Sequence, residues 1–425
     1  MHSATHDTIA AVWRIESAKI TAVVARMVRD VGVAEELAQD ALVSALERWP
    51  HDGIPSNAAA WLMTAAKNRA LDHLRHEKLA AQKHEEIGHD LQAQEALIVP
   101  DFVDALAAAQ EDPIGDDMLR LVFTACHPVL STEARTALTL KLLAGLTTHE
   151  IARAYLVPEP TIAQRIVRAK KTLSEAKVPF DLPPADALGQ RLASVLEVVY
   201  LIYNEGYTAT AGEDWQRPAL CAEALRLARM LAELAPGEPE VHGLVALMEL
   251  QSSRAPARVD AQGKPVLLAD QDRMRWDRQL IRRGLAALER AKSHGAPAGP
   301  YQLQAEIAAC HALAARAQDT EWQRIAQVYA QLAEINPSPV IELNRAVAVG
   351  MADGPAAGLA IIDRIAGDKS LRNYHWLPSV RGDLLAKLGR NEEAKSEFER
   401  AAMLAGNARE KELLMERAAA MGARH

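Results

Sequence analysis

The segment "TTHEIARAYLVPEPTIAQRIVRAKKTL", residues 147–173, decides the fold of the middle of the chain. Apolar residues recur in it at intervals of three and four, which is the pattern of an amphipathic helix, and a Val-Pro pair interrupts that pattern. Thr147 or Thr148 can cap a first helix that has Glu150 in its first turn. Pro160 is tolerated only in a first turn, so it marks the start of a second helix. The spacing predicts a helix-turn-helix.

The second of these helices has two distinct faces. At helical spacing, Ile162, Ile166, Ala169 and Leu173 share a narrow apolar face that should be buried. The other face is polar and basic, as expected of a helix that enters the major groove of DNA. The expected DNA contacts are Gln164 and Arg168 to base edges, Ala163 and Val167 to thymine methyl groups, Thr161 beside them, and Arg165, Lys170 and Lys171 to phosphates.

The charge of this helix contrasts with that of the whole chain. The formal net charge is −8, yet residues 160–173 contain four basic residues and no acidic one. An ordinary solvated helix with surface Lys and Arg is the alternative interpretation. The helix that precedes it and the charge contrast favour DNA binding. The overall negative charge also predicts weak non-specific DNA affinity for the free protein.

Length and composition set the broad class. A chain of 425 residues is too long for one hydrophobic core. Aromatic residues make up only 4%, and the abundance of Ala, Leu, Glu and Arg predicts an all-α protein. The three cysteines are far apart with no CxxC pair, so we expect no disulfide framework and no zinc site. Without a leader or a long apolar run, we expect a soluble cytoplasmic protein with no cofactor and no metal.

Changes in pattern along the chain predict four parts. These are a helical bundle at residues 8–77, an acidic linker at 78–117, the helix-turn-helix domain at 118–180, and a succession of helices at 185–425, after a proline-rich boundary.

The end of the last part resembles a tetratricopeptide repeat in the stretch "RGDLLAKLGRNEEAKSEFERAAMLA". The small residues Gly382, Ala394 and Ala401 would let two helices approach, Phe398 would fill the gap, and Gly389 falls in the turn. We therefore expect a tetratricopeptide-like helical-repeat domain.

The region "STEARTALTLKLLAGLTTHEIARAYLVPEPTIAQRIVRAKKTL" resembles the promoter −35-binding domain of extracytoplasmic-function sigma factors, in the sigma-70 family. The combination of Ile-Ala, Val-Pro and Thr-Ile-x-x-Arg carries the resemblance, although Pro160 stands where the family usually has Gly. The resemblance implies that the residues above read the −35 element. It also implies an upstream domain that binds core RNA polymerase and the −10 element, and a linker that threads the polymerase channel.

Two stretches of the N-terminal bundle resemble the parts of such an upstream domain. "GVAEELAQDALVSALERW" resembles the helix that docks on the polymerase clamp, which implies polymerase contacts by Glu36, Leu37, Asp40, Val43 and Glu47. "NAAAWLMTAAKNRALDHLRHEK" resembles the −10-reading helices, which implies single-strand contacts by Asn57, Lys67, Asn68, Arg69, Asp72, His73 and Arg75. We expect Trp61 to be a core anchor. For Asn68 and Asp72 a helix cap or a salt bridge is an equal alternative.

The C-terminal part resembles the extension of a sigma-factor subgroup in which the extension controls activity. Two stretches in it look unlike scaffold, "YLIYNEGYTATAGEDWQRPAL" and "PARVDAQGKPVLLADQDRMRWDRQLI". They suggest a regulatory surface, for another protein or for the sigma domains themselves, formed by Tyr203, Asn204, Glu205, Tyr207, Asp272, Arg273, Trp276 and Asp277. The alternative for the second stretch is an internal salt-bridge cluster that closes the superhelix.

The sequence contains no nucleophile elbow, no phosphate-binding Gly loop and no HExxH motif, and we expect no catalytic activity. Cys126-His127 is expected to hold a core cysteine rather than a catalytic pair. The interpretation favoured here is a sigma factor that directs promoter recognition and transcription initiation. A helix-turn-helix regulator with a helical-repeat sensor, acting without polymerase, remains an alternative, as does a repeat scaffold whose sigma-like domains have lost promoter function.

Overall fold

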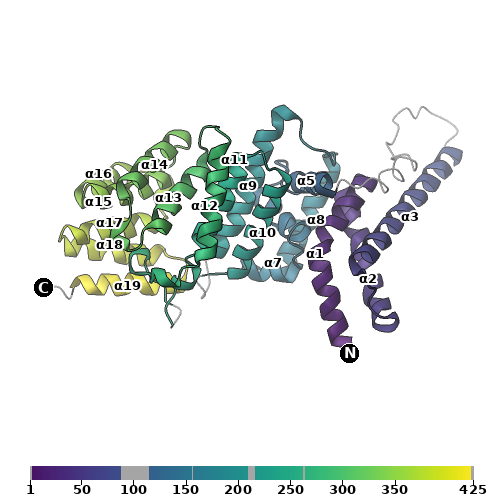
Figure 1. Ribbon diagram of the computed structural model, residues 1–425, viewed down its shortest axis with the longest axis horizontal. Helices are drawn as coiled ribbons and strands as arrows, with labels where there is room; N and C mark the ends of the chain where they lie inside the picture. The colour runs from purple at the N-terminus through teal and green to yellow at the C-terminus, as the bar shows by residue number, and fades with distance from the viewer. Residues whose placement is uncertain (1, 88–113, 156, 209–215, 262–263, 423–425) are drawn as a thin grey trace. The chain divides into compact units, whose positions relative to one another are not determined.

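The computed structural model describes residues 2–87, 114–155, 157–208, 216–261 and 264–422 (Figure 1). Within these ranges the chain is helical and has no strand, apart from one isolated bridge between Val259 and Pro265. The all-α prediction is therefore confirmed. None of the described helices is long and apolar enough to cross a membrane.

The chain divides into two compact units, residues 1–199 and 200–425. The first unit contains α1 (His2–Val28), α2 (Val31–Asp52), α3 (Ala58–Ile87), α5 (Ile114–Ala125), α6 (Thr132–Leu142), α7 (Thr148–Tyr155), α8 (Glu159–Glu175) and the first part of α9 (Ala185–Tyr207).

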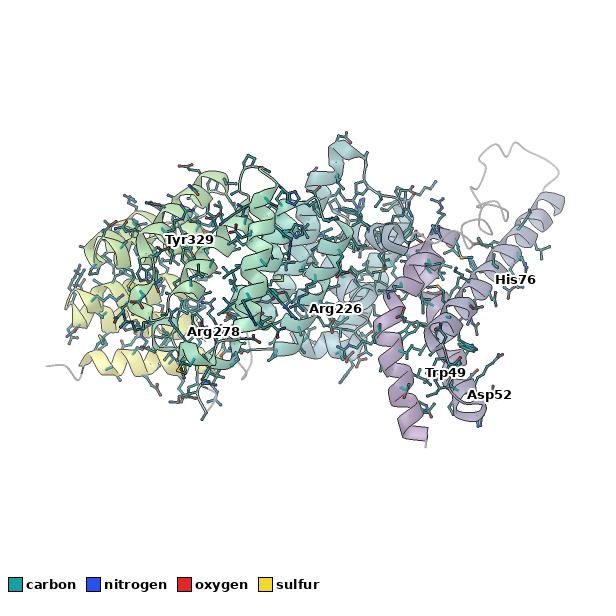
Figure 2. The ribbon with its side chains drawn as sticks, viewed as in Figure 1. Trp49, Asp52, His76, Arg226, Arg278 and Tyr329 are labelled. Carbon is teal, nitrogen blue, oxygen red and sulfur yellow. The ribbon has the colours of Figure 1, made fainter. Side chains whose placement is uncertain are left out.

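Helices α1, α2 and α3 pack together as the predicted N-terminal bundle. The inner face of α2 is lined by fully buried alanines at Ala34, Ala38, Ala41 and Ala45, one turn apart, and such small side chains let neighbouring helices approach closely. Trp49, near the end of α2 (Figure 2), meets Trp61 of α3, which Figure 2 does not label, edge to face with ring centroids 5.4 Å apart. Trp61 is therefore part of the packing, as expected.

The acidic linker is partly helical at both ends. Helix α3 continues to Ile87 and α5 begins at Ile114, while the middle of the predicted linker lies outside the described residues. Asp117, the last linker residue, is fully buried. Its carboxylate lies 3.0 Å from Arg26 Nε of α1 and 2.7 Å from Arg120 Nη1. This end of the linker is thus a packed joint between α1 and α5.

The division between the units falls inside α9, not in the proline-rich run that the sequence suggested. The first part of α9 packs on the helix-turn-helix domain. Arg191 donates a hydrogen bond to the Phe123 carbonyl (2.7 Å) and Ser194 donates to the Cys126 carbonyl (3.1 Å). These contacts hold residues 185–199 in the first unit.

The second unit continues with α10 (Pro218–Leu234), α11 (Pro239–Ser252), η1 (Ala255–Ala257), η2 (Leu268–Asp270), η3 (Arg273–Arg275), α12 (Arg278–Ser293), α13 (Pro300–Leu313), η4 (Ala317–Asp319), α14 (Trp322–Ile335), α15 (Pro339–Ala352), α16 (Pro355–Ile365), η5 (Lys369–Leu371), α17 (Trp376–Lys387), α18 (Asn391–Leu404) and α19 (Ala408–Gly422). From α13 to α19 each helix packs against the next, as in a helical-repeat array (Figure 1).

The predicted repeat at the end of the chain is present in detail. A Cβ atom at Gly382 of α17 would lie 2.8 Å from the Phe398 ring of α18, so only glycine allows this approach. Phe398, Ala394 and Ala401 are all buried. Gly389 has a φ of +75°, which is the left-handed conformation that ends α17.

Candidate nucleic-acid interface

The first helix of the helix-turn-helix is set by a reciprocal cap. The Thr147 N–H donates to Glu150 Oε2 (2.7 Å), and the Glu150 N–H donates to Thr147 Oγ1 (3.1 Å), which is a capping box. Partial burial opposes ionisation of Glu150, but the hydrogen bonds from Thr147 outweigh it and lower the pKa of the carboxyl group. The expected cap is confirmed.

The second helix, α8, begins at Glu159 with Pro158 before it, and Pro160 lies in its first turn. Pro158 offers no side-chain cap, and its carbonyl accepts a hydrogen bond from the Thr161 N–H (2.9 Å). Because a first-turn N–H has no helical partner, proline at position 160 costs no hydrogen bond. The departure from the family pattern is therefore compatible with a regular helix.

The two faces of α8 lie where periodicity placed them. Ile162, Ile166, Ala169 and Leu173 are each no more than 5% exposed. The exposed residues of the opposite face include Thr161, Gln164, Val167, Arg168 and Lys171. Val167 is 63% exposed and so presents an apolar side chain on this face. Ala163 and Arg165 are half-buried at the margins.

A groove of about 540 Å³ runs between the start of α6 and the outer face of α8. Gln164, Arg165 and Arg168 form one wall, and Ser131 and Glu133 belong to the other. Hydrogen bonds from its own N–H and from Ser131 lower the pKa of Glu133, and Arg165 adds a smaller contribution. The guanidiniums of Arg165 and Arg168 thus border an open groove.

Lys170 differs from the other basic residues of α8, because its ammonium forms an ion pair with Glu35 of α2. Glu35 is only 6% exposed. It also accepts a hydrogen bond from Gln39 (2.6 Å) and lies 3.7 Å from Lys141 Nζ. In this structure Lys170 therefore joins the helix-turn-helix domain to the N-terminal bundle. Sequence reasoning placed Lys170 with the phosphate contacts and did not foresee this pairing.

The residues assigned to −10 binding lie along α3 and in the turn that precedes it. Asn57 Oδ1 accepts the Ala60 N–H (3.0 Å), so its side chain caps the start of α3. Asn68 and Arg75 are exposed, while Lys67 is half-buried. The structure thus places Asn68 and Arg75 on an accessible face and gives Asn57 a structural role.

Other members of that set are tied to neighbours. Arg69 donates to Ser44 Oγ (2.6 Å) and lies 3.5 Å from Asp40, both on α2. Asp72 pairs with Arg75 at 3.0 Å, and His73 lies 3.4 Å from Glu77. These contacts link α3 to α2 and order the polar face of α3.

The residues assigned to polymerase binding form a stripe on α2. Glu36, Asp40, Val43 and Glu47 are all exposed, at intervals of three and four, and Leu37 beside them is half-buried. Val43 is 49% exposed. An apolar residue flanked by acids along one helix face is suited to a protein partner with basic and apolar contacts.

Comparisons with known proteins agree with this geometry. Residues 14–79 match the family described as Sigma-70 region 2, and residues 120–173 match Sigma-70, region 4. The ECF RNA polymerase sigma factor SigK of Mycobacterium tuberculosis is 31% identical over 159 residues, which cover 78% of that protein and 36% of this chain. The chain belongs to the extracytoplasmic-function sigma factors.

Two further relatives extend the comparison. The probable ECF RNA polymerase sigma factor SigI of the same organism is 28% identical over 182 residues, 59% of its length and 42% of this chain. An uncharacterized protein of Rhizobium meliloti (strain 1021) is 43% identical over 386 residues, 89% of its length and 91% of this chain. Residues 191–292 match a family of unknown function, DUF6596. As a sigma factor, the protein binds core RNA polymerase and promoter DNA, and the regulator that acts without polymerase is not favoured.

The regulatory surface expected in the second unit of this sigma factor needs correction. Tyr203 is fully buried, and its hydroxyl group donates to the Met248 carbonyl (3.1 Å). Trp276 is 2% exposed and Arg273 is 8% exposed. Burial of these three side chains rules them out as parts of an exposed surface. They are core residues. For Arg273 and Trp276, their burial is closer to the alternative interpretation of the second stretch, an internal cluster.

The remaining members of that set serve local structure. Asp272 accepts the Met274 N–H (2.9 Å), and Asp277 accepts the N–H groups of Gln279 and Leu280 at the start of α12. Glu205 forms an ion pair with Arg217, while Asn204 and Tyr207 are half-buried. The cluster is held by caps and carbonyl contacts more than by the acid–base pairs that the sequence suggested.

Cys126 of this sigma factor is a buried core residue, as expected. Its thiol lies 3.3 Å from Thr139 Oγ1, and burial raises its pKa to about 11. Burial also lowers the pKa of His127 to about 4, while its Nδ1 accepts the Val129 N–H (3.1 Å). At neutral pH the thiol is protonated and the imidazole is engaged with backbone, so the pair is structural.

Proposed function

We propose that this sigma factor reads the −35 element with the exposed face of α8 and captures −10 single strand on the polar face of α3. The stripe on α2 docks on core polymerase, and the second unit regulates these steps. The observation that carries the proposal is the division of α8 into a wholly buried apolar face and an exposed face bearing Gln164, Val167 and Arg168.

The chemistry of the α8 face supports base reading. An arginine at position 168 has the paired N–H donors that match guanine O6 and N7, and a glutamine at position 164 can pair with adenine N6 and N7. Val167, which is 63% exposed, offers an apolar contact for a thymine methyl group. Lys171, whose ammonium is 3.5 Å from Glu175 on the same exposed face, is placed for a phosphate.

The chemistry of α3 supports strand capture in a similar way. Asn68 and Arg75 supply exposed hydrogen-bond donors on one helix, and such donors suit the backbone and base edges of a single strand. Arg69 and Asp40 form an exposed pair between α3 and α2. We infer that this pair couples the DNA-facing helix to the polymerase-facing helix.

We also infer that the two promoter-binding domains separate when they engage DNA. In the first unit they are joined by the Lys170–Glu35 and Arg26–Asp117 ion pairs. The −35 and −10 elements are about 25 base pairs apart, or about 85 Å at about 3.4 Å per base pair. Two domains in direct side-chain contact cannot reach both elements along straight duplex DNA. The contacts between them must therefore break.

The remaining parts of the proposal follow from the class of protein. The protein acts in the cytoplasm, where polymerase and promoters are, and lowers the cost of strand opening by binding unstacked bases rather than by catalysis. The helical-repeat unit controls activity through a partner or through the sigma domains.

Run-off transcription tests the proposal. Core polymerase is combined with the full chain on fragmented genomic DNA, and in parallel with a chain that ends at Val199 and so keeps the first part of α9. Transcripts that share −35 and −10 elements are expected from the full chain. Gln164→Ala should lose transcripts from promoters that carry the preferred −35 base, whereas Ser174→Ala, an exposed residue at the end of α8, should not.

The outcomes separate the parts of the proposal. A difference between the full chain and the shorter chain shows that the second unit regulates initiation, and its direction gives the sign. If Gln164→Ala and Ser174→Ala transcribe the same promoters equally, the assignment of α8 to −35 reading is wrong. If neither chain directs initiation although both bind polymerase, the chain alone is not sufficient as proposed.

A further inference from the structure

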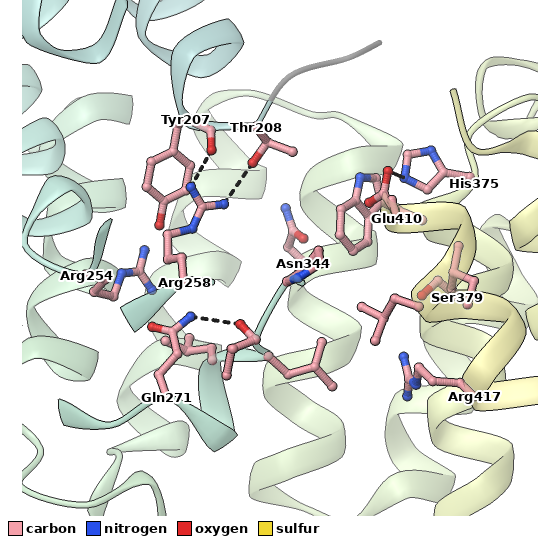
Figure 3. Close-up of a pocket in the computed structure, with 17 residues that line it drawn as sticks. Tyr207, Thr208, Arg254, Arg258, Gln271, Asn344, His375, Ser379, Glu410 and Arg417 are labelled. Carbon is pink, nitrogen blue, oxygen red and sulfur yellow. Dashed lines mark hydrogen bonds and ion pairs between the residues drawn. The ribbon is translucent and has the colours of Figure 1, made fainter. Parts of the chain in front are cut away.

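A pocket of about 480 Å³ lies within the second unit, and none of its lining residues was assigned above to DNA or polymerase (Figure 3). Its walls come from the end of α9, the irregular segment between α11 and α12, and helices α15, α17 and α19. Both sequence stretches that looked unlike scaffold contribute to it, through Tyr207 and through residues 265–271. The volume is in the range of small-molecule sites.

The described part of the irregular wall is held by several hydrogen bonds and an ion pair. The Val266 N–H donates to the Arg258 carbonyl (2.8 Å), and the Asp277 N–H donates to the Ser253 carbonyl (2.9 Å). Lys264 lies 2.5 Å from Glu416, which fastens this segment to α19. Arg273 anchors its other end by donating to the His311 carbonyl. A wall held at this many points presents a preformed cavity rather than a collapsed loop.

The charges that line the pocket are mainly positive. Arg254, Arg258 and Arg417 face it, with Glu410 as the acidic residue and His375 at 3.1 Å from Glu410 (Figure 3). Arg254 and Arg258 flank the short helix η1, and Arg417 comes from α19, far away in sequence and on the opposite side of the pocket. A guanidinium presents paired N–H donors that match a carboxylate, sulfonate or phosphate.

Two of these arginines are held in place by other groups. Arg258 is 5% exposed, donates to the Tyr207 carbonyl and to Thr208 Oγ1 (3.0 Å), and lies over the Tyr207 ring with its Cζ 3.5 Å from the centroid. Burial lowers its pKa, so a bound anion would stabilise its charged form. Arg417 is paired with Asp383 and lies over the Phe398 ring.

Arg254 is placed differently. It is half-buried and lies 5.9 Å from the Tyr207 centroid, and among the described residues no carboxylate lies within ion-pair distance of its guanidinium. On the acidic side of the pocket, Glu410 is 7% exposed and its Oε1 has no hydrogen-bond partner among the described groups. A cation and a buried acceptor that face the same cavity indicate a ligand with an anionic group and a donor or a water molecule near Glu410.

Much of the remaining lining is apolar, and Thr208, Gln271, Asn344 and Ser379 are its polar members. Leucines, Val266 and Pro265 form much of the wall, and two large apolar side chains are left open to it, Leu267 at 42% and Trp376 at 38% exposure. An inorganic anion alone would leave the apolar part of the pocket wall exposed to water. The combination therefore favours a molecule with an apolar body and one anionic end.

We propose that this pocket binds a small organic anion, with a carboxylate or sulfonate beside the guanidiniums of Arg254 and Arg258 and an apolar body against Leu267 and Trp376. The site gives the helical-repeat unit a ligand of its own. The proposal does not depend on promoter recognition, because binding is measured without polymerase or DNA.

A pair of fluorescent probes tests the site on the full chain. One probe is 8-anilinonaphthalene-1-sulfonate, and the other is N-phenyl-1-naphthylamine, which has the same rings and no charge. We expect one sulfonate bound per chain, at least tenfold tighter than the uncharged probe. We also expect 2-naphthoate to displace the sulfonate at concentrations where the neutral 2-naphthamide does not.

Two variants and a control locate the binding. Arg254→Gln should weaken the sulfonate at least tenfold and the uncharged probe less than twofold, and Trp376→Ala should weaken both. Arg372→Gln, an exposed arginine outside the pocket, should change neither. Circular dichroism confirms that each variant is folded, and the naphthoate–naphthamide comparison on the unaltered chain stands without any variant.

Several results would overturn the proposal. Equal affinity for the charged and uncharged probes would indicate an apolar patch with no anion site. Several dye molecules per chain, unaffected by either variant, would indicate adsorption to the surface. Displacement by an acidic decapeptide but not by 2-naphthoate would indicate a peptide groove. Absence of any fluorescence change at 1 mM probe, about the weakest affinity worth assigning, would exclude the site.

Discussion

Helix α8 and the segment around Arg273 both bring basic residues close together in an acidic chain, yet they use their charges in opposite ways. On α8, Arg168 is exposed on a face that borders a groove. In the other segment, Arg273 is 8% exposed and donates to two backbone carbonyls, those of His311 and Ala314. One arginine is available to a partner, and the other is part of the core.

A cluster of charged residues in a sequence therefore does not by itself show whether the side chains are exposed. On a regular helix, the apolar face determines which side is buried, so the exposed side follows from a period of 3.6. Arg273 lies in a three-residue 3₁₀ turn between Asp272 and Trp276, where no period applies. There, the neighbours brought by the rest of the fold decide whether a side chain is exposed.

The largest effect is expected from Arg273→Ala. It removes the donors to the His311 and Ala314 carbonyls and the contact of the guanidinium with the Trp276 ring, at 4.6 Å. A buried acceptor and a half-buried one would be left without these donors, at a cost of about 3 kcal/mol in the free energy of unfolding. Urea unfolding of the second unit, followed by tryptophan fluorescence, measures it.

Arg275→Ala is the matched control, because Arg275 is two residues away and exposed. Its effect should stay within about 0.5 kcal/mol. Equal destabilisation by the two substitutions would show that the two arginines are not distinguished by burial. Neither substitution should change binding to a −35 duplex.

Arg168→Ala should have the opposite effects to Arg273→Ala, because it should weaken DNA binding and leave the stability unchanged. We expect binding of the polymerase holoenzyme to its promoter to weaken by about 2 kcal/mol, or about 30-fold, if Arg168 makes a bidentate contact with a base. Because Arg168 is exposed, the melting temperature should not change. Competition binding at a fixed salt concentration measures the affinity. An unchanged affinity, or an equal loss on all −35 sequences, would remove Arg168 from the base-reading set.

His311 is a buried ionisable residue next to Arg273, so its burial should make the stability of the protein depend on pH. Burial, with the charges of Arg254 and Arg273, lowers its pKa to about 3. Between about pH 6.5 and pH 3 the unfolded chain binds a proton at this position that the folded chain does not, so stability falls as the pH falls. We expect a loss of about 1.4 kcal/mol per pH unit below about pH 6.5 from this group.

His311→Phe keeps an aromatic ring beside Trp322, whose centroid is 5.2 Å away, and removes the titration. The pH dependence of unfolding between pH 6.5 and 5.5 should become shallower in this variant. His149→Phe makes the same replacement at an exposed histidine and serves as the comparison. Parallel slopes for all three proteins would show that His311 is protonated in the folded state.

Lys170 is the basic residue of α8 that forms an ion pair with Glu35 of α2. Glu35→Gln tests how much this ion pair contributes. The substitution removes the carboxylate that pairs with Lys170 and lies near Lys141. We expect the contact between the two promoter-binding domains to weaken by about 1 kcal/mol, since both lysines retain some access to water. Faster hydrogen–deuterium exchange in the facing parts of α2 and α8 would reveal it.

Glu36→Gln is the control for this change, because it has the same chemistry on the adjacent, exposed residue. It should leave the exchange rates of α8 unaltered. If Glu35→Gln also leaves them unaltered, the ion pair does not hold the two domains together.

Several features could be predicted from the sequence because they depend on residues close together in the chain. The buried face of α8, the cap at Thr147 and Glu150, and the packing of Gly382 on Phe398 all arise within one helix or one helix pair. The burial of Tyr203 could not be predicted in this way. Its hydroxyl group reaches the Met248 carbonyl, 45 positions along the chain.

The sequence by itself determined that the protein is helical, that α8 carries an apolar face opposite a basic one, and that the chain is a sigma factor. Local periodicity and motif spacing carry that information, because helical geometry is set by neighbours three and four residues apart. The tertiary structure alone decided that Lys170 meets Glu35, that Arg273 is buried, and that Arg254 and Arg417 face one pocket. These pairings join residues far apart in sequence, and whether a charge meets water, a partner or a cavity depends on which helices the fold brings beside it.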